Sequence, residues 1–152
     1  MTKRTLLFSL AGVAAVGGVV AGGLAASAAS AAPEKPALKN GSAHYTAPSA
    51  NAAGSFTYTV DVSDDSGIRG LKVVAWPASS KLNPTATDLR SVESATCKTT
   101  SDDTSRCTYT LKISKKDAAA AAKGTWYVSA LATAKDGDTT FASKAATFDI
   151  TG

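Results

Sequence analysis

The sequence has few of the residues on which enzymes commonly rely. It contains one histidine, His44, and two cysteines. No G-x-S-x-G, H-E-x-x-H or glycine-rich phosphate-binding motif occurs in it. Histidine is the residue type that most often acts as a general base near neutral pH, and this chain offers only one. We therefore expect no enzyme, and we interpret His44 as an exposed or hydrogen-bonded histidine rather than a catalytic base.

Scarce cysteine limits metal and redox chemistry in the same way. A structural zinc site would need two further ligands at suitable spacing, and a redox pair favours the C-x-x-C arrangement. Cys97 and Cys107 are therefore expected to form one structural disulfide. Closing so short a loop stabilises the folded state by about 2.5–3 kcal/mol in the chain-entropy model.

Charged residues are also sparse, at 18% of the chain, and the formal net charge is +4. The basic residues form no cluster, and a nucleic-acid interface would need a basic face. We therefore expect no nucleic acid among the partners of this protein.

Near the start of the chain, residues 5–24 form an uncharged and mostly apolar run. It follows Lys3 and Arg4 and precedes two small-x-small sites within residues 26–31. This order is typical of a secretory signal peptide, so we expect residues 1–31 to be cleaved and the product to be secreted, extracellular and free of the membrane. An uncleaved anchor is the alternative, because about 20 apolar residues can span a bilayer.

The remaining chain is the size of a single domain. Residues 32–41 contain two prolines and no periodicity, which predicts a flexible linker, and residues 42–152 form the domain, expected to be a monomer. Alternating apolar residues between turn signals predict seven short strands. They lie at residues 44–47, 56–62, 68–76, 92–98, 106–113, 126–132 and 141–150.

The connections between these strands are also readable. Asp136-Gly137 is a strong hairpin signal, and the cysteines join the strands at 92–98 and 106–113 as a stapled hairpin. Ser114 and Asp117 predict the start of a short helix before residue 124. Seven strands in a domain of this size favour an all-β, immunoglobulin-like sandwich with strands A to G and a helix in the E–F connection.

Two segments, Val60-Asp-Val-Ser-Asp-Asp-Ser-Gly-Ile68 and Gly124-Thr-Trp-Tyr-Val-Ser-Ala-Leu-Ala132, resemble bacterial extracellular immunoglobulin-like and fibronectin-like repeats. Trp126 stands where such repeats usually have a corner tyrosine. The whole chain also resembles an uncharacterised family of small secreted proteins from high-GC Gram-positive bacteria. The resemblance implies the fold and carries no activity, because one fold hosts many functions.

Acidic residues gather in three loops that an immunoglobulin-like sandwich would bring to one end. They are Asp64 and Asp65 in the B–C loop, Asp102 and Asp103 in the D–E loop, and Asp136 and Asp138 in the F–G loop. Calcium is one interpretation, because it takes six to eight oxygen ligands. The other, which we favour, is that Asp-Asp and Asp-Gly simply form turns.

Strand alternation suggests a second surface. If Val73 faces the core, Trp76 faces outward beside Tyr127, and an exposed aromatic pair could bind glycans or proteins. The alternative, which we favour, is an inward Trp76, as in antibody domains.

We therefore expect a secreted, non-catalytic binding module whose partner is a protein, a cell-wall polymer or a glycan. The alternatives are a protease inhibitor or a small-ligand carrier that uses the disulfide-tethered hairpin.

Overall fold

The computed structural model describes residues 34–151, and the predicted signal peptide lies outside these residues. The described chain forms seven strands and two short helices. In order they are β1 (Ala37–Thr46), β2 (Gly54–Ser63), β3 (Ile68–Pro77), α1 (Ala86–Leu89), β4 (Thr96–Thr99), β5 (Thr104–Ile113), α2 (Lys115–Ala120), β6 (Gly124–Ala134) and β7 (Thr139–Ile150). None of the helices within residues 34–151 is long and apolar enough to span a bilayer.

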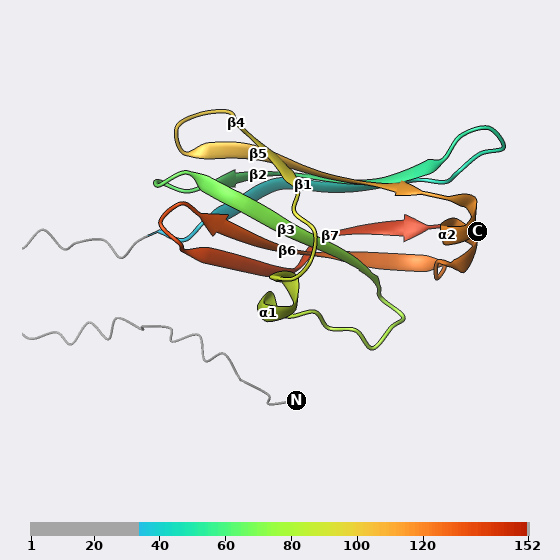
Figure 1. Ribbon diagram of the computed structural model, residues 1–152. Coiled ribbons are helices and arrows are strands. Elements are labelled where there is room, and N and C mark those ends of the chain that lie inside the picture. Colours follow the sequence, from blue (N-terminus) through green and yellow to red (C-terminus); the bar gives the residue numbers. More distant parts are fainter. Residues whose placement is uncertain (1–33, 152) are drawn as a thin grey trace, which may run out of the picture. The chain divides into compact units, whose positions relative to one another are not determined.

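The strands form two antiparallel sheets that pack face to face (Figure 1). One has the order β1-β2-β5-β4 and the other the order β3-β6-β7. The hydrophobic core lies between them and draws its side chains from the inward faces of both sheets. A mostly β domain of seven strands, with a disulfide-linked hairpin, is therefore confirmed.

β2 illustrates why these residues form strands. Phe56, Tyr58, Val60 and Val62 are at most 3% exposed, whereas the residues between them are half-buried. Burying a large apolar side chain contributes roughly 1.5–3 kcal/mol, so a register slip by one residue would expose the whole set. β5 continues this face of the core within the same sheet, and β6 of the opposite sheet contributes Val128, Ala130 and Ala132. The residues between these three on β6 are buried as well.

β1 is longer than the sequence predicts. It begins at Ala37, inside the predicted linker of residues 32–41, and pairs with β2 along most of its length. A bulge around Asn40, where φ is 55°, reverses the alternation. Leu38 before the bulge and Tyr45 after it both pack against the core. No single period-two pattern therefore runs through this strand, and the domain starts earlier than residue 42.

The predicted strand at residues 92–98 is divided between the two sheets. The backbone N–H of Ala95 donates to the carbonyl of Leu71 on β3 (2.8 Å), and the N–H of Val73 donates to the carbonyl of Glu93 (3.4 Å). Only the four residues of β4 pair with β5. This segment thus passes from the edge of one sheet to the edge of the other.

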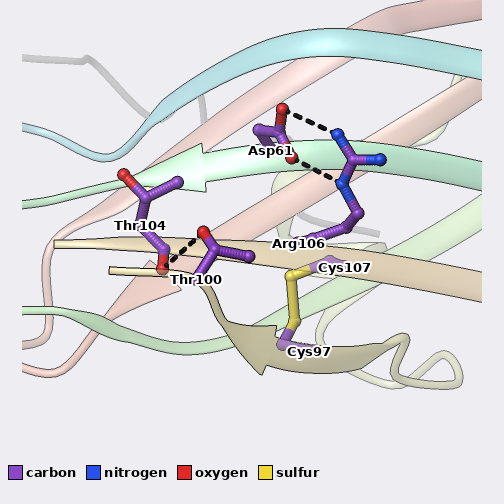
Figure 2. The surroundings of a disulfide bond; sticks show 6 residues. All are labelled: Asp61, Cys97, Thr100, Thr104, Arg106 and Cys107. Carbon is purple, nitrogen blue, oxygen red and sulfur yellow. Dashed lines mark hydrogen bonds and ion pairs between the residues drawn. A yellow bond between two sulfur atoms is a disulfide. The ribbon is translucent and has the colours of Figure 1, made fainter. Parts of the chain in front are cut away.

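The disulfide fixes the register of the short β4 (Figure 2). Cys97 and Cys107 lie directly opposite each other in the β4–β5 pairing, and their sulfur atoms are bonded. On the other side of β5, Arg106 donates to both carboxylate oxygens of Asp61 on β2, at 3.0 and 3.2 Å. β5 is therefore held covalently to one neighbour and by an ion pair to the other.

Both helices begin with a capping box, in which a hydroxyl and a carboxylate three residues apart satisfy each other's backbone N–H. For α2 the capping pair is Ser114 and Asp117, as predicted. α1, capped by Thr85 and Asp88, was not predicted. It lies against the outer face of the β3-β6-β7 sheet (Figure 1), where it buries Leu89 completely.

We expect Leu89→Ala to lower the free energy of unfolding by about 2–5 kcal/mol, because the substitution leaves a cavity under α1. Urea denaturation followed by tryptophan fluorescence measures the change. Leu82→Ala is the matched control, since Leu82 lies in the same connection and is 59% exposed; it should change stability by no more than about 0.5 kcal/mol. Equal effects of the two substitutions would contradict the role of α1 as a cover.

Candidate functional site

A cavity of about 550 Å³ opens between the two sheets at the end of the sandwich that carries α2. Its walls come from β3, from residues 91–93, from residues 109–113 of β5, from α2 and from the ends of β6 and β7. β4 pairs only with residues 105–108 of β5. The second half of β5 is thus an unpaired edge, and the cavity opens between this edge and β3.

Aromatic side chains form the deep wall of the cavity. The ring centroid of Phe148 lies 4.6 Å from that of Phe56, 6.0 Å from that of Trp126 and 6.4 Å from that of Tyr45. Tyr109 continues the cluster, 6.2 Å from Phe56. These separations are those of favourable aromatic pairs. Five rings, joined in a chain of contacts through Phe148 and Phe56, thus present a preformed apolar surface.

The polar groups of the cavity are few. The hydroxyl of Tyr109 donates to the Glu93 carboxylate (2.9 Å). Burial is the larger cause, and this hydrogen bond the second, that raises the pKa of Tyr109 to about 12. Hydrogen bonds from Ser114 lower the pKa of Asp117, which is the second acidic group of the lining. The charged side chains that line the cavity are therefore both carboxylates.

Trp126 and α2 hold this end of the sandwich together. The indole N–H of Trp126 donates to the carbonyl of Ala122 (2.9 Å), four residues upstream. Ala121, between α2 and this carbonyl, packs against the core and lines the cavity. The wall formed by α2 is thus anchored to β6.

The acidic loops lie at the opposite end, and three of the six calcium candidates come together there. One carboxylate oxygen from each of Asp64, Asp65 and Asp136 lies within 4.8 Å of the others. The remaining candidates, Asp102, Asp103 and Asp138, are not part of this cluster. Asp103 instead accepts hydrogen bonds from the neighbouring hydroxyls of Ser101 and Thr104.

Trp76 and Tyr127 are neighbours, with ring centroids 4.9 Å apart, but they do not form an open platform. Trp76 alternates with the core residues of β3 and so lies on the outer face of its sheet, where it is nevertheless only 5% exposed. Its indole N–H donates to the hydroxyl of Ser129 (2.9 Å). Leu89 of α1 and its flanking segment cover it, so it points neither into solvent nor into the space between the sheets.

His44 is exposed on β1, and within residues 34–151 its side chain has no hydrogen-bond partner. The tip of the disulfide hairpin is a tight turn, in which the Thr100 N–H and hydroxyl bond to the carbonyl of Thr104 (Figure 2). Neither cysteine lines the cavity. A ligand in the cavity would therefore contact the second half of β5, beyond Cys107, and not the loop between the two cysteines.

Comparison with protein families finds a match over residues 38–132, to a family of unknown function (DUF5707). The matched segment is more than half of the chain. The chain belongs to this family. Comparisons with curated proteins and with solved structures find no match. For this DUF5707 member, the matched residues include β1 to β5 and most of β6, and so much of the cavity wall.

Alternation within the predicted strands indicates an inward orientation for two of the five cavity rings, but not that a space remains beside them. Inward alternation accounts for Phe56 and Trp126. That Tyr109 lies on an unpaired edge depends on where β4 begins, and alternation along residues 92–98 does not determine this. The weak signal that was available is Glu93, a charge placed in an otherwise strand-like segment.

We expect the stability of the protein to fall between about pH 10 and pH 12, because an unfolded phenol ionises near 10. A group whose pKa is higher in the folded state contributes stability that is complete below the unfolded pKa and is lost as the pH rises through the folded one. Tyr109→Phe should therefore flatten this decline, and so should Tyr58→Phe, because burial raises the pKa of Tyr58 to about 12. Urea denaturation at several pH values checks this; parallel profiles for Tyr109→Phe and the unmodified protein would contradict it.

Proposed function

We propose that this protein is an exported, non-catalytic binding protein that holds a small, mainly apolar molecule in the cavity between its sheets. The cavity is the observation that carries the proposal. Among the functions considered from the sequence, this one is closest to a small-ligand carrier, with the ligand beside β5 rather than on the hairpin tip.

We infer an immunoglobulin-like topology for the scaffold. The strand orders β1-β2-β5-β4 and β3-β6-β7 correspond to the A-B-E-D and C-F-G sheets of constant-type immunoglobulin domains. The Trp126–Ala122 bond supports this inference, because it joins the start of strand F to the backbone upstream. A tyrosine hydroxyl makes the equivalent bond in immunoglobulin domains, and here an indole N–H supplies the donor.

The size of the cavity favours a small molecule over a protein partner. Sites for small ligands commonly measure roughly 300–1,000 Å³ and combine apolar walls with a few polar groups. The five rings provide such a wall, and Tyr109, Ser91 and the two carboxylates provide the polar groups. Because both charged groups are acidic, we infer a ligand that is neutral or cationic.

Two features favour binding over catalysis. Glu93 and Asp117 accept hydrogen bonds from Tyr109 and Ser114, and neither is hydrogen-bonded to Ser91, the serine that lines the cavity. The exposed His44 neighbours the lining residue Tyr45 along β1, but its side chain lies on the opposite face of the strand and does not line the cavity. A disulfide, and the lack of a membrane-spanning helix within residues 34–151, are compatible with an extracellular soluble protein.

A protein, cell-wall polymer or glycan remains a candidate partner for the outer surface.

We expect the purified, oxidised protein to bind the neutral probe N-phenyl-1-naphthylamine saturably, at one site, with an increase in the probe's fluorescence. Ala121→Trp should weaken this binding at least tenfold, because Ala121 lines the cavity and an indole would occupy it. Fluorescence titration measures both affinities.

Ala119→Trp is the matched control for this substitution. It adds the same side chain to α2 at an exposed position that does not line the cavity, and it should leave the affinity unchanged. Probe binding that is absent, not saturable, or equally affected by the two substitutions would refute the proposed function.

A further inference from the structure

Three carboxylates converge where two turns meet at the end of the sandwich opposite the cavity. Asp64 and Asp65 belong to the β2–β3 turn, and Asp136 belongs to the β6–β7 turn. One oxygen from each lies within 4.8 Å of the others. That span is about twice a Ca²⁺–oxygen distance of 2.3–2.6 Å, so all three oxygens can ligate one calcium ion.

Asp64 supplies a second and independent observation. Its side chain is only 4% exposed, and it lies outside the hydrophobic core cluster. Its Oδ1 accepts hydrogen bonds from the N–H (2.9 Å) and the hydroxyl (2.6 Å) of Ser66. Its Oδ2 is buried and has no hydrogen-bond partner within residues 34–151. An unsatisfied buried acceptor is costly, and more so when it is charged.

Aspartate side chains are ionised at neutral pH, and the two hydrogen bonds from Ser66 satisfy only Oδ1 of Asp64. The buried Oδ2 is therefore part of a carboxylate, beside two further carboxylates. Like charges this close repel one another, and a cation relieves both the repulsion and the unsatisfied acceptor.

The two turns are fastened to each other, which preorganises the cluster. The N–H of Asp136 donates to the hydroxyl of Ser66 (3.2 Å), and the N–H of Lys135 donates to the carbonyl of Gly67 (2.9 Å). Arg69 donates to the carbonyl of Lys135 (2.9 Å). Each bond links the β2–β3 turn or the start of β3 to the β6–β7 turn, so little ordering remains for a ligand to impose.

Two basic side chains, those of Arg69 and Lys135, lie near the two turns but, among the described residues, form no ion pair with the cluster. The guanidinium of Arg69 donates a hydrogen bond to the backbone carbonyl of Lys135. The end of the Lys135 side chain lies against Gly67. No ion pair joins either of them to Asp64, Asp65 or Asp136 in the described chain.

We propose that the carboxylates of Asp64, Asp65 and Asp136 bind one calcium ion. Calcium suits the site better than magnesium, because it accepts irregular oxygen geometry, whereas magnesium demands a near-ideal octahedron. Asp65 and Asp136 are exposed, so water completes the coordination. Such a site falls in the weak range of extracellular modules, with a Kd of about 10⁻⁴–10⁻³ M.

Thermal unfolding of the purified, oxidised protein in calcium and in chelator tests the proposal. At ten times Kd, calcium should raise the Tm by about 5 °C, because it binds the folded state. Sodium chloride of the same ionic strength should not. Identical curves with 10 mM calcium and with chelator would overturn the proposal, and an equal rise with magnesium would overturn the assignment to calcium.

Substitutions at exposed positions locate the site without endangering the fold. Asp65→Asn and Asp136→Asn should each weaken calcium binding at least tenfold in calorimetric titrations. Asp102→Asn is the matched control, because Asp102 is an exposed acidic residue of the β4–β5 turn outside the cluster; it should bind calcium as the unmodified protein does. Lys135→Met should bind calcium more tightly, since it removes a nearby positive charge. An equal loss in Asp102→Asn would indicate diffuse attraction to an acidic surface and would refute the site.

Discussion

The cavity and its opening depend on one constraint: β5 has ten residues, and its neighbour β4 has only four. β4 cannot begin earlier, because the backbone groups of Glu93 and Ala95 are bonded to β3 in the other sheet. The disulfide between Cys97 and Cys107 then fixes the register at which β4 joins β5. The rest of β5 remains without a partner on that side. The segment 93–99 therefore joins the two sheets beside residues 105–108 of β5 and leaves residues 109–113 at the opening of the cavity.

An opening of this kind has an energetic consequence. Empty volume in a protein core costs about 24 cal/mol per Å³, so a sealed, empty cavity of 550 Å³ would cost about 13 kcal/mol. That is as large as the whole stability of a typical domain, roughly 5–15 kcal/mol. A cavity of this volume can persist only if solvent or a ligand fills it. Its apolar walls interact poorly with water, and an apolar ligand would release that water, which is the general driving force for binding.

The sequence was informative wherever one physical signal governed one element. Alternation predicted β2 and β5, in which one face is more buried than the other, and also β6, although α1 covers its outer face as well. The Ser114–Asp117 box predicted α2. The start of β1 could not be predicted, since the bulge at Asn40 moves the buried positions from even to odd numbers. α1 has only four residues, too few for a periodic pattern. The sequence placed acidic residues in three loops, of which two contribute to the carboxylate cluster, and which three carboxylates meet depends on side-chain geometry within the turns.

The two candidate sites are built on opposite ends of the same strands, and this separation determines how they can influence each other. Eight residues along β2 separate Asp64 from Phe56, which corresponds to about 26 Å. No loop contributes to both sites, and the strands between them are held by the core. Without an element that has two alternative arrangements, binding at one end has no means of changing affinity at the other. Each ligand should then add its own increment to the stability of the folded state, so that the increments from a cation and an apolar molecule together are additive.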